Sequence, residues 1–123
     1  MNKILITDDS LTMRKMVKSA LRSVSECEFL EAANGLEAIE IIAMQHPDLV
    51  LLDINMPDMN GLEVLKFIRS HHLFHSVPVI MLSTRSDEGI KSETLAAGAS
   101  VYLTKPFSAD DLMYVVKDQL KRS

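Results

Sequence analysis

The chain has 123 residues, of which 47% are hydrophobic and 24% are charged. A chain of this length buries roughly two-thirds of its unfolded surface, so we expect one folded domain over residues 1–123. The formal net charge of −4 excludes a strongly basic protein, and we expect no direct binding to nucleic acid. A single cysteine excludes an internal disulfide, and no apolar run approaches the roughly 20 residues that span a bilayer. We therefore expect a cytoplasmic protein with no membrane partner.

Five short apolar runs alternate with longer amphipathic segments along the chain. The runs are residues 3–7, 28–32, 49–52, 79–82 and 101–103. Unbroken apolar stretches in the first, third and fourth runs are typical of strands that are covered on both faces. The second run is more polar and is predicted to lie at a sheet edge.

The first two amphipathic segments have the apolar spacing of helices. The predicted inner face of the first helix consists of Met13, Met16, Val17, Ala20, Leu21 and Val24. The second helix is predicted to begin after Asn34, because Glu37 follows at the spacing of a capping box. Its predicted apolar residues are Leu36, Ile39, Ile42 and Ala43.

Three further segments complete the alternation. The third helix has a stripe made of Leu62, Leu65 and Ile68, which Val64 flanks. The fourth segment, residues 87–97, is weakly amphipathic, since Ile90 and Leu95 are its only large apolar residues. Ser108 and Asp111 open the last helix, which has a predicted inner face of Leu112, Val115, Val116 and Gln119 or Leu120. Strands that alternate with helices predict an α/β domain with a parallel sheet covered on both faces.

Polar side chains gather at one edge of this predicted sheet. Asp8 and Asp9 follow the first strand, Asp53 follows the third, Ser83 the fourth and Lys105 the fifth. Taken singly, each has an ordinary alternative role, such as capping the next helix. Three carboxylates in one crevice repel each other, however, and Mg2+ would neutralise them because it prefers oxygen ligands. With a lysine and a hydroxyl beside it, such a cluster predicts a site that handles phosphoryl groups.

Other classes of function lack their sequence patterns. No phosphate-binding glycine loop or dinucleotide-binding turn follows the first strand, and there is no nucleophile elbow. His71, His72 and His75 lie together and His46 is remote, which is not the spacing of a zinc site. We interpret the three clustered histidines as a solvated helix end and loop.

The motifs around these residues resemble the response-regulator receiver family over essentially the whole chain. The matching segments are residues 6–10, 51–57, 59–61, 82–84 and 102–107. The resemblance implies a flavodoxin-like (βα)5 fold, with a doubly wound five-stranded parallel sheet in strand order 2-1-3-4-5. It also implies a cis peptide bond between Lys105 and Pro106.

The resemblance further implies that Asp53 is the phosphoacceptor. Mg2+ would be bound directly by Asp9 and Asp53, through water by Asp8, and by the backbone carbonyl of Asn55. The residues implied to bind the phosphoryl oxygens are Ser83 and Lys105. The donor would be the phosphohistidine of a sensor histidine kinase. The chain would then not be a conventional enzyme, since it would catalyse only its own phosphorylation and dephosphorylation.

A conformational switch is also implied by the resemblance. Phosphorylation would draw Ser83 inward and let Tyr102 rotate from an exposed to a buried position. Thr84 replaces the alanine or glycine that is common in the family, and it is expected to tune the lifetime of the phosphate. Arg85 and Asn55 lie at two other positions that tune this lifetime.

Two interpretations of the pathway remain open. The first is a stand-alone chemotaxis regulator that acts as a monomer and binds a flagellar motor switch protein. The second is a receiver of another phosphorelay, or of a larger regulator with an output domain. A pure interaction module with an inactive site is disfavoured because every expected site residue is present.

Overall fold

The computed structural model describes residues 1–24, 26–57 and 59–122. Strands and helices alternate as the sequence predicts. The strands are β1 (Asn2–Thr7), β2 (Cys27–Ala32), β3 (Leu49–Asp53), β4 (Val79–Ser83) and β5 (Val101–Thr104). The helices are α1 (Leu11–Ala20), α2 (Gly35–Gln45), α3 (Gly61–Ser70), α4 (Glu88–Ala96) and α5 (Ala109–Arg122). Within the described ranges, no helix combines the length and apolar character that crossing a membrane requires.

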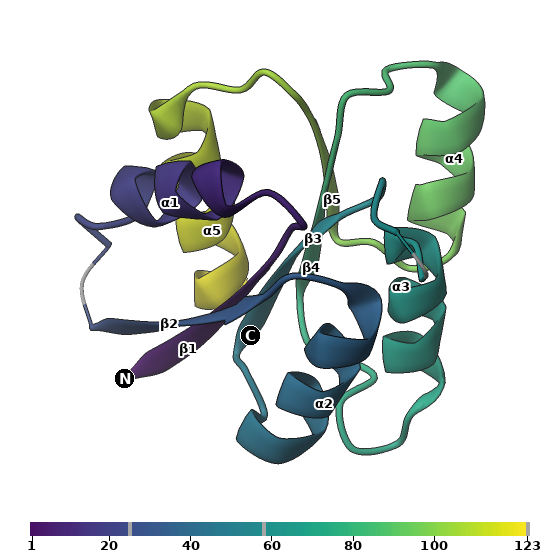
Figure 1. Ribbon diagram of the computed structural model, residues 1–123, viewed down its shortest axis with the longest axis horizontal. Coiled ribbons are helices and arrows are strands. Elements are labelled where there is room, and N and C mark those ends of the chain that lie inside the picture. Colours follow the sequence, from purple (N-terminus) through teal and green to yellow (C-terminus); the bar gives the residue numbers. More distant parts are fainter. Residues whose placement is uncertain (25, 58, 123) are drawn as a thin grey trace.

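The five strands form one parallel sheet in the order β2-β1-β3-β4-β5. This order confirms the flavodoxin-like α/β fold, and the more polar β2 lies at an edge as predicted. Helices α1 and α5 cover one face of the sheet, and α2, α3 and α4 cover the other (Figure 1). The carboxyl ends of all five strands therefore point to the same edge, where loops lead into the helices.

Each central strand contributes to two separate cores, because successive side chains point to opposite faces. Leu51 and Ile80 pack on the side of α1 and α5. Val50, Leu52 and Met81 pack on the side of α2, α3 and α4. All residues of β3 and β4 are buried, which explains why these two runs are the least interrupted by polar residues.

Helix α1 is shorter than its apolar pattern predicts. Ser10 caps its first turn by accepting a hydrogen bond from the Met13 N–H at 3.1 Å. The helix ends at Ala20, and Leu21 and Val24 reach the core from the turn that follows. The prediction for Met16 is wrong: its side chain is 58% exposed, because the adjacent Val17 defines the inward direction.

The caps of α2 and α3 differ in one contact. Asn34 accepts a hydrogen bond from the Glu37 N–H, but the Glu37 carboxylate bonds the Ala33 N–H instead of closing a full capping box. Asn60 and Glu63 form the complete capping box at α3.

Along α3 the predicted inner stripe needs one correction. Its buried apolar residues are Val64, Leu65 and Ile68, and Leu62 is only half-buried.

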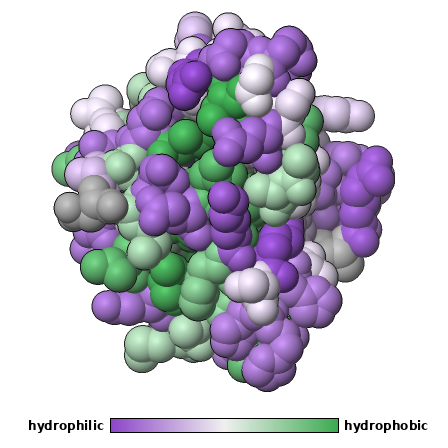
Figure 2. Space-filling model, turned by 90° about the vertical axis from the view of Figure 1, so that its right-hand side faces the viewer, coloured by the Kyte–Doolittle hydropathy of each residue, from purple (hydrophilic) through white to green (hydrophobic). Residues whose placement is uncertain are grey.

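Helix α4 has little apolar anchorage, as its sequence predicts. Its one buried residue is Thr94, whose hydroxyl donates to the Ile90 carbonyl oxygen at 2.7 Å. Leu95 is 42% exposed. On the side of the molecule that carries α3 and α4, hydrophilic residues cover much of the surface and hydrophobic residues show between them (Figure 2). The last helix is better anchored, since Leu112 and Val116 of α5 are fully buried.

Gly61 allows the start of α3 to approach the end of β3 closely. Its N–H donates to the Ile54 carbonyl oxygen at 3.0 Å. A Cβ atom at this position would lie 2.9 Å from the Ile54 Cα and would collide with the carbonyl oxygen of Asp53. Only glycine fits against this backbone, so Gly61 helps to fix the loop that follows Asp53.

We expect Gly61→Ala to lower the free energy of unfolding by about 2 kcal/mol, because the added methyl group overpacks against main-chain atoms. Gly89→Ala is the matched control, since its Cβ would meet only the Asp87 Oδ2 at 3.7 Å. It should be neutral or slightly stabilising. Urea denaturation of both variants checks this, and equal stabilities would contradict the close approach.

Candidate functional site

The predicted polar residues do meet at the carboxyl edge of the sheet. Asp53 ends β3 and Ser83 ends β4, and the strand register pairs Asp53 with Leu82 and Ser83 with Thr104. Asp8 directly follows β1, and Lys105 directly follows β5. Four strands that are distant in sequence thus deliver their terminal residues to one place because they run parallel.

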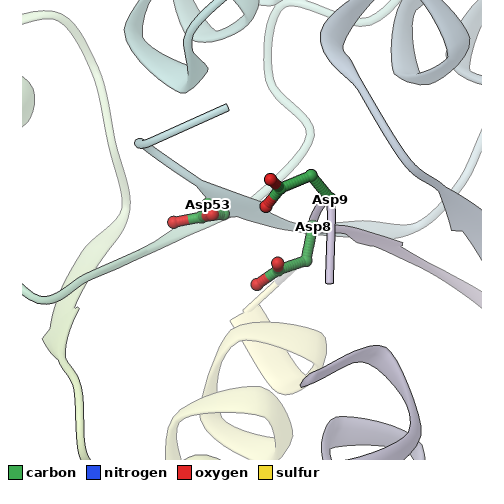
Figure 3. A group of neighbouring side chains, drawn as sticks. All are labelled: Asp8, Asp9 and Asp53. Atoms are coloured by element: carbon green, nitrogen blue, oxygen red, sulfur yellow. The ribbon is translucent and has the colours of Figure 1, made fainter. Parts of the chain in front are cut away.

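Three carboxylates form the centre of this edge (Figure 3). One oxygen from each of Asp8, Asp9 and Asp53 lies within 4.8 Å of the others. Asp8 and Asp53 are buried, at 3% and 4% exposure, whereas Asp9 is exposed. The carboxylate of Asp9 is directed toward Asp53 (Figure 3). The cluster therefore has a buried floor and one side that is open to solvent.

Lys105 places its ammonium group between the two buried carboxylates. Its Nζ lies 3.2 Å from the Asp8 Oδ2 and 3.4 Å from the Asp53 Oδ1, and the side chain is only 12% exposed. Burial nevertheless raises the pKa of the Asp53 carboxyl; Lys105 opposes this shift and Asp8 adds to it. One ammonium group thus does not fully compensate two neighbouring carboxylates.

The N–H, the carbonyl oxygen and both carboxylate oxygens of Asp8 each form a hydrogen bond. Its N–H donates to the Ala32 carbonyl oxygen at 3.1 Å, and its own carbonyl oxygen accepts from the Arg14 Nη1 at 2.6 Å. Its Oδ1 accepts from the Ser10 N–H at 2.9 Å, and its Oδ2 accepts from Lys105. Asp8 is therefore a rigid part of the site.

Asp53 has one committed and one open oxygen. The Oδ1 accepts a hydrogen bond from the Asn55 N–H at 3.3 Å and also pairs with Lys105. The Oδ2 has no hydrogen-bond partner within the described chain. Asn55 itself is exposed, and its N–H is the group that contacts Asp53.

Ser83, Arg85 and Tyr102 are linked through one residue's main chain. The fully buried Ser83 accepts a hydrogen bond at its Oγ from the Arg85 N–H at 3.0 Å. The hydroxyl of Tyr102 donates to the Arg85 carbonyl oxygen at 2.6 Å, and the ring is buried in the core. The Arg85 guanidinium pairs with Asp87 at 3.2 Å, and Thr84 is exposed. The structure therefore shows Tyr102 in the buried one of the two predicted orientations.

The donors at this edge suit a hard divalent cation. All three clustered acids offer carboxylate oxygens, which Mg2+ prefers, and the one exposed member leaves room for water ligands. In the part of the chain that the structure describes, no other group of three or more acidic, histidine or cysteine side chains has this spacing. His71 instead stacks on Phe74, with ring centroids 4.1 Å apart, and on His72 at 5.0 Å. His71 and His72 thus form an aromatic cluster with Phe74 at the end of α3, and His75 is exposed.

The sequence patterns did not predict a group of contacts that holds the main chain of Asp8. Arg14 of α1 bonds the Asp8 carbonyl oxygen and pairs with Glu31 of β2 at 2.9 Å, and Lys18 pairs with Glu31 at 3.1 Å. Although partial burial acts to raise it, hydrogen bonds from Lys18 and Arg14 hold the pKa of Glu31 below its usual value. The only signal in the sequence is a glutamate in an apolar run and two basic residues one helical turn apart.

The cis peptide bond expected between Lys105 and Pro106 is present.

Comparisons with known proteins identify the family. The model of the response regulator receiver domain matches residues 4–117. Protein PilG of Pseudomonas aeruginosa is 36% identical over 115 residues, which cover 94% of this chain and 84% of that protein. Chemotaxis protein CheY1 of Helicobacter pylori is 38% identical over 120 residues, which cover 97% and 94%. The crystal structure of Vibrio cholerae chemotaxis protein CheY4 superposes with a TM-score of 0.89 at 34% identity, covering 97% of this chain and 98% of that chain.

The chain belongs to the response regulator receiver domain family. It is a receiver domain of the two-component type, a class of domain that implies a histidine kinase as partner. Its similarity to CheY proteins extends over nearly its whole length.

The raised pKa of Asp53 makes a prediction about stability. A carboxyl whose pKa is raised on folding stabilises the fold when protonated, and this contribution is lost as pH rises through the folded pKa. We therefore expect Asp53→Asn to raise the free energy of unfolding at about pH 7 in a chelator. The gain should shrink as pH falls to about 3, where Asp53 is also neutral.

Asp87→Asn is the control of opposite sign. Asp87 accepts a hydrogen bond from the Ile90 N–H and pairs with Arg85, and both contacts lower its pKa. Its contribution is present above the ordinary pKa and is lost as pH falls through the folded pKa. This variant should therefore be less stable near neutral pH and equal to the parent in acid. Denaturant unfolding at several pH values checks both, and a gain independent of pH for Asp53→Asn would contradict the assignment.

Proposed function

We propose that this receiver accepts a phosphoryl group on Asp53 from the phosphohistidine of a sensor histidine kinase, in a Mg2+-dependent reaction. The observation that supports this most strongly is the open Oδ2 of a buried carboxylate beside an ammonium group and two further acids. Each carboxylate oxygen of Asp8 already accepts a hydrogen bond, and Asp9 is exposed. Of the three acids, Asp53 is therefore the best placed nucleophile.

The residues present suit such a transfer. A carboxylate oxygen of Asp53 attacks phosphorus, the P–N bond of the phosphohistidine breaks, and the imidazole leaves with the electron pair. The Lys105 ammonium group and the Ser83 hydroxyl would bind phosphoryl oxygens. Mg2+, when bound by Asp9, Asp53 and the Asn55 carbonyl with Asp8 acting through water, would supply charge to offset these oxygens. Attack of water on phosphorus then breaks the P–O bond to Asp53, releases inorganic phosphate and restores the carboxylate.

We expect Asp53→Asn to abolish labelling by a phosphorylated histidine kinase and by a small phosphoryl donor, because an amide is not a nucleophile at neutral pH. Asp48→Asn is the control, since Asp48 precedes β3 at the opposite end of the same strand and its carboxylate accepts a hydrogen bond from the Lys3 N–H. It should be labelled normally. Phosphate incorporation measured by mass spectrometry checks both, and full labelling of Asp53→Asn would overturn the acceptor assignment.

We also propose that Ser83 and Tyr102 transmit the phosphorylation state to the surface beside α4, β5 and α5. The support is the main chain of Arg85, which bonds Ser83 through its N–H and Tyr102 through its carbonyl oxygen. A movement of Ser83 toward a phosphoryl group would displace this peptide and change the hydrogen bond of Tyr102. The loose anchorage of α4 suits a segment that rearranges. We further propose that Thr84, Arg85 and Asn55 tune the lifetime of the phosphate.

The signal itself is proposed to be a chemotactic one, read by a flagellar motor switch protein. Its support is the similarity to proteins named CheY over almost the whole chain. The alternative is a receiver of another phosphorelay. PilG, which is not named as a chemotaxis protein, matches at a comparable level and favours keeping this alternative.

Binding to the motor switch protein separates these two proposals. We expect the receiver to bind it more tightly with beryllofluoride as a phosphoryl mimic, and Tyr102→Ala to lose most of this difference. Met44→Ala is the control, because Met44 is 79% exposed on α2 and lies outside the proposed α4, β5 and α5 surface. Titration calorimetry with and without the mimic measures the effect. An undiminished response in Tyr102→Ala would refute the coupling role, and no binding in any state would favour the other phosphorelay.

A further inference from the structure

Arg14 makes a contact that the proposed chemistry does not use. Its Nη1 donates to the carbonyl oxygen of Asp8 at 2.6 Å, and its Nε donates to the Glu31 Oε1 at 2.9 Å. The guanidinium group lies between α1 and the edge strand β2, and its side chain is only 14% exposed. A planar group with two donors in fixed geometry thus joins the acidic loop to the sheet edge.

The Asp8 carbonyl belongs to the same peptide unit as the Asp9 nitrogen. Because the peptide unit is planar, a bond at the Asp8 oxygen also fixes the orientation of the Asp9 N–H and Cα. The Asp9 carboxylate has no hydrogen bond or ion pair within the described ranges, so its own side chain does not fix it. The direction in which Asp9 leaves the main chain is therefore set by what holds the preceding carbonyl.

An ion pair with Glu31 fixes the position of the Arg14 guanidinium group. It accepts from Arg14 through one carboxylate oxygen and from Lys18 through the other, at 2.9 and 3.1 Å. The strand register pairs Glu31 with Ile6, and the next residue, Ala32, bonds the Asp8 N–H. The two ends of Asp8's main chain are thus tied to β2, one directly and the other through Arg14.

We propose that Arg14, held by Glu31, is a positioning residue that orients the Asp8–Asp9 peptide and so sets the affinity of the acidic cluster for a divalent cation. This inference rests on the proposed Mg2+ site. The inference predicts a change in cation affinity opposite to the one that simple electrostatics predicts. Removing a positive charge beside a cation site would strengthen cation binding, whereas loss of the orienting bond weakens it.

The test is a titration of the unphosphorylated full chain with Mg2+ alone, followed by amide chemical shifts and by calorimetry. We expect Arg14→Gln to weaken Mg2+ binding about tenfold and to shift the Asp9 amide signal before any metal is added. Arg14→Lys keeps the charge but has no planar fork, so it should also weaken binding. Lys18→Gln removes a charge from the same carboxylate without touching Asp8, and it should bind Mg2+ within about twofold of the parent.

Melting temperatures of all variants show whether each is folded at the temperature of the titration. If Arg14→Gln is not folded, Arg14→Lys decides the outcome. Mg2+ binding by Arg14→Gln and Arg14→Lys as tight as in the parent, or tighter, would overturn the positioning role and leave the proposed function intact. A parent chain that binds no Mg2+ would overturn both, so the two failures are distinguishable.

Discussion

The ammonium group of Lys105 lies between the buried carboxylates of Asp8 and Asp53, and the geometry of the site depends on this contact. Two like charges side by side in a buried place cost free energy, and a cation at 3.2 and 3.4 Å offsets part of that cost. The three residues come from the ends of β1, β3 and β5, so the contact forms only when the sheet has its full strand order. Correct folding and assembly of the site are thus one event.

The compensation by Lys105 is incomplete, which explains what the site can accept. Burial leaves the pKa of Asp53 raised in spite of the ammonium group, and Asp9 adds a third acid at the open side. Such a site favours added positive charge, and the Asp53 Oδ2 has no hydrogen-bond partner among the described residues. The three acids have the same chemistry but different surroundings: Asp8 is fixed by hydrogen bonds, Asp9 faces solvent, and Asp53 is buried and is the proposed phosphoacceptor.

Main-chain groups, more than side chains, connect this centre to the rest of the molecule. Arg14 bonds the carbonyl oxygen of Asp8, and Tyr102 bonds the carbonyl oxygen of Arg85. In both cases a large side chain from a neighbouring element holds a peptide in the loop after a strand. A rigid peptide transmits displacement well because only its two flanking torsions can rotate. Positions in these loops are therefore sensitive to residues that never touch the reacting atoms.

By itself the sequence determined the order of the elements, the edge position of β2 and the meeting of Asp8, Asp9, Asp53, Ser83 and Lys105. Unbroken apolar runs that alternate with helical patterns predict parallel strands, and the carboxyl ends of parallel strands lie at one edge of the sheet. The strand order came from resemblance, not from periodicity. Tertiary structure alone decided that Met16 is exposed and Val64 buried. Where two adjacent helical residues are both apolar, the sequence pattern does not determine which of them faces the sheet. It also decided which oxygen of Asp53 is free and that Arg14 bonds the Asp8 main chain. A contact between a side chain and a distant carbonyl leaves no periodic trace in the sequence, because every residue has the same carbonyl group.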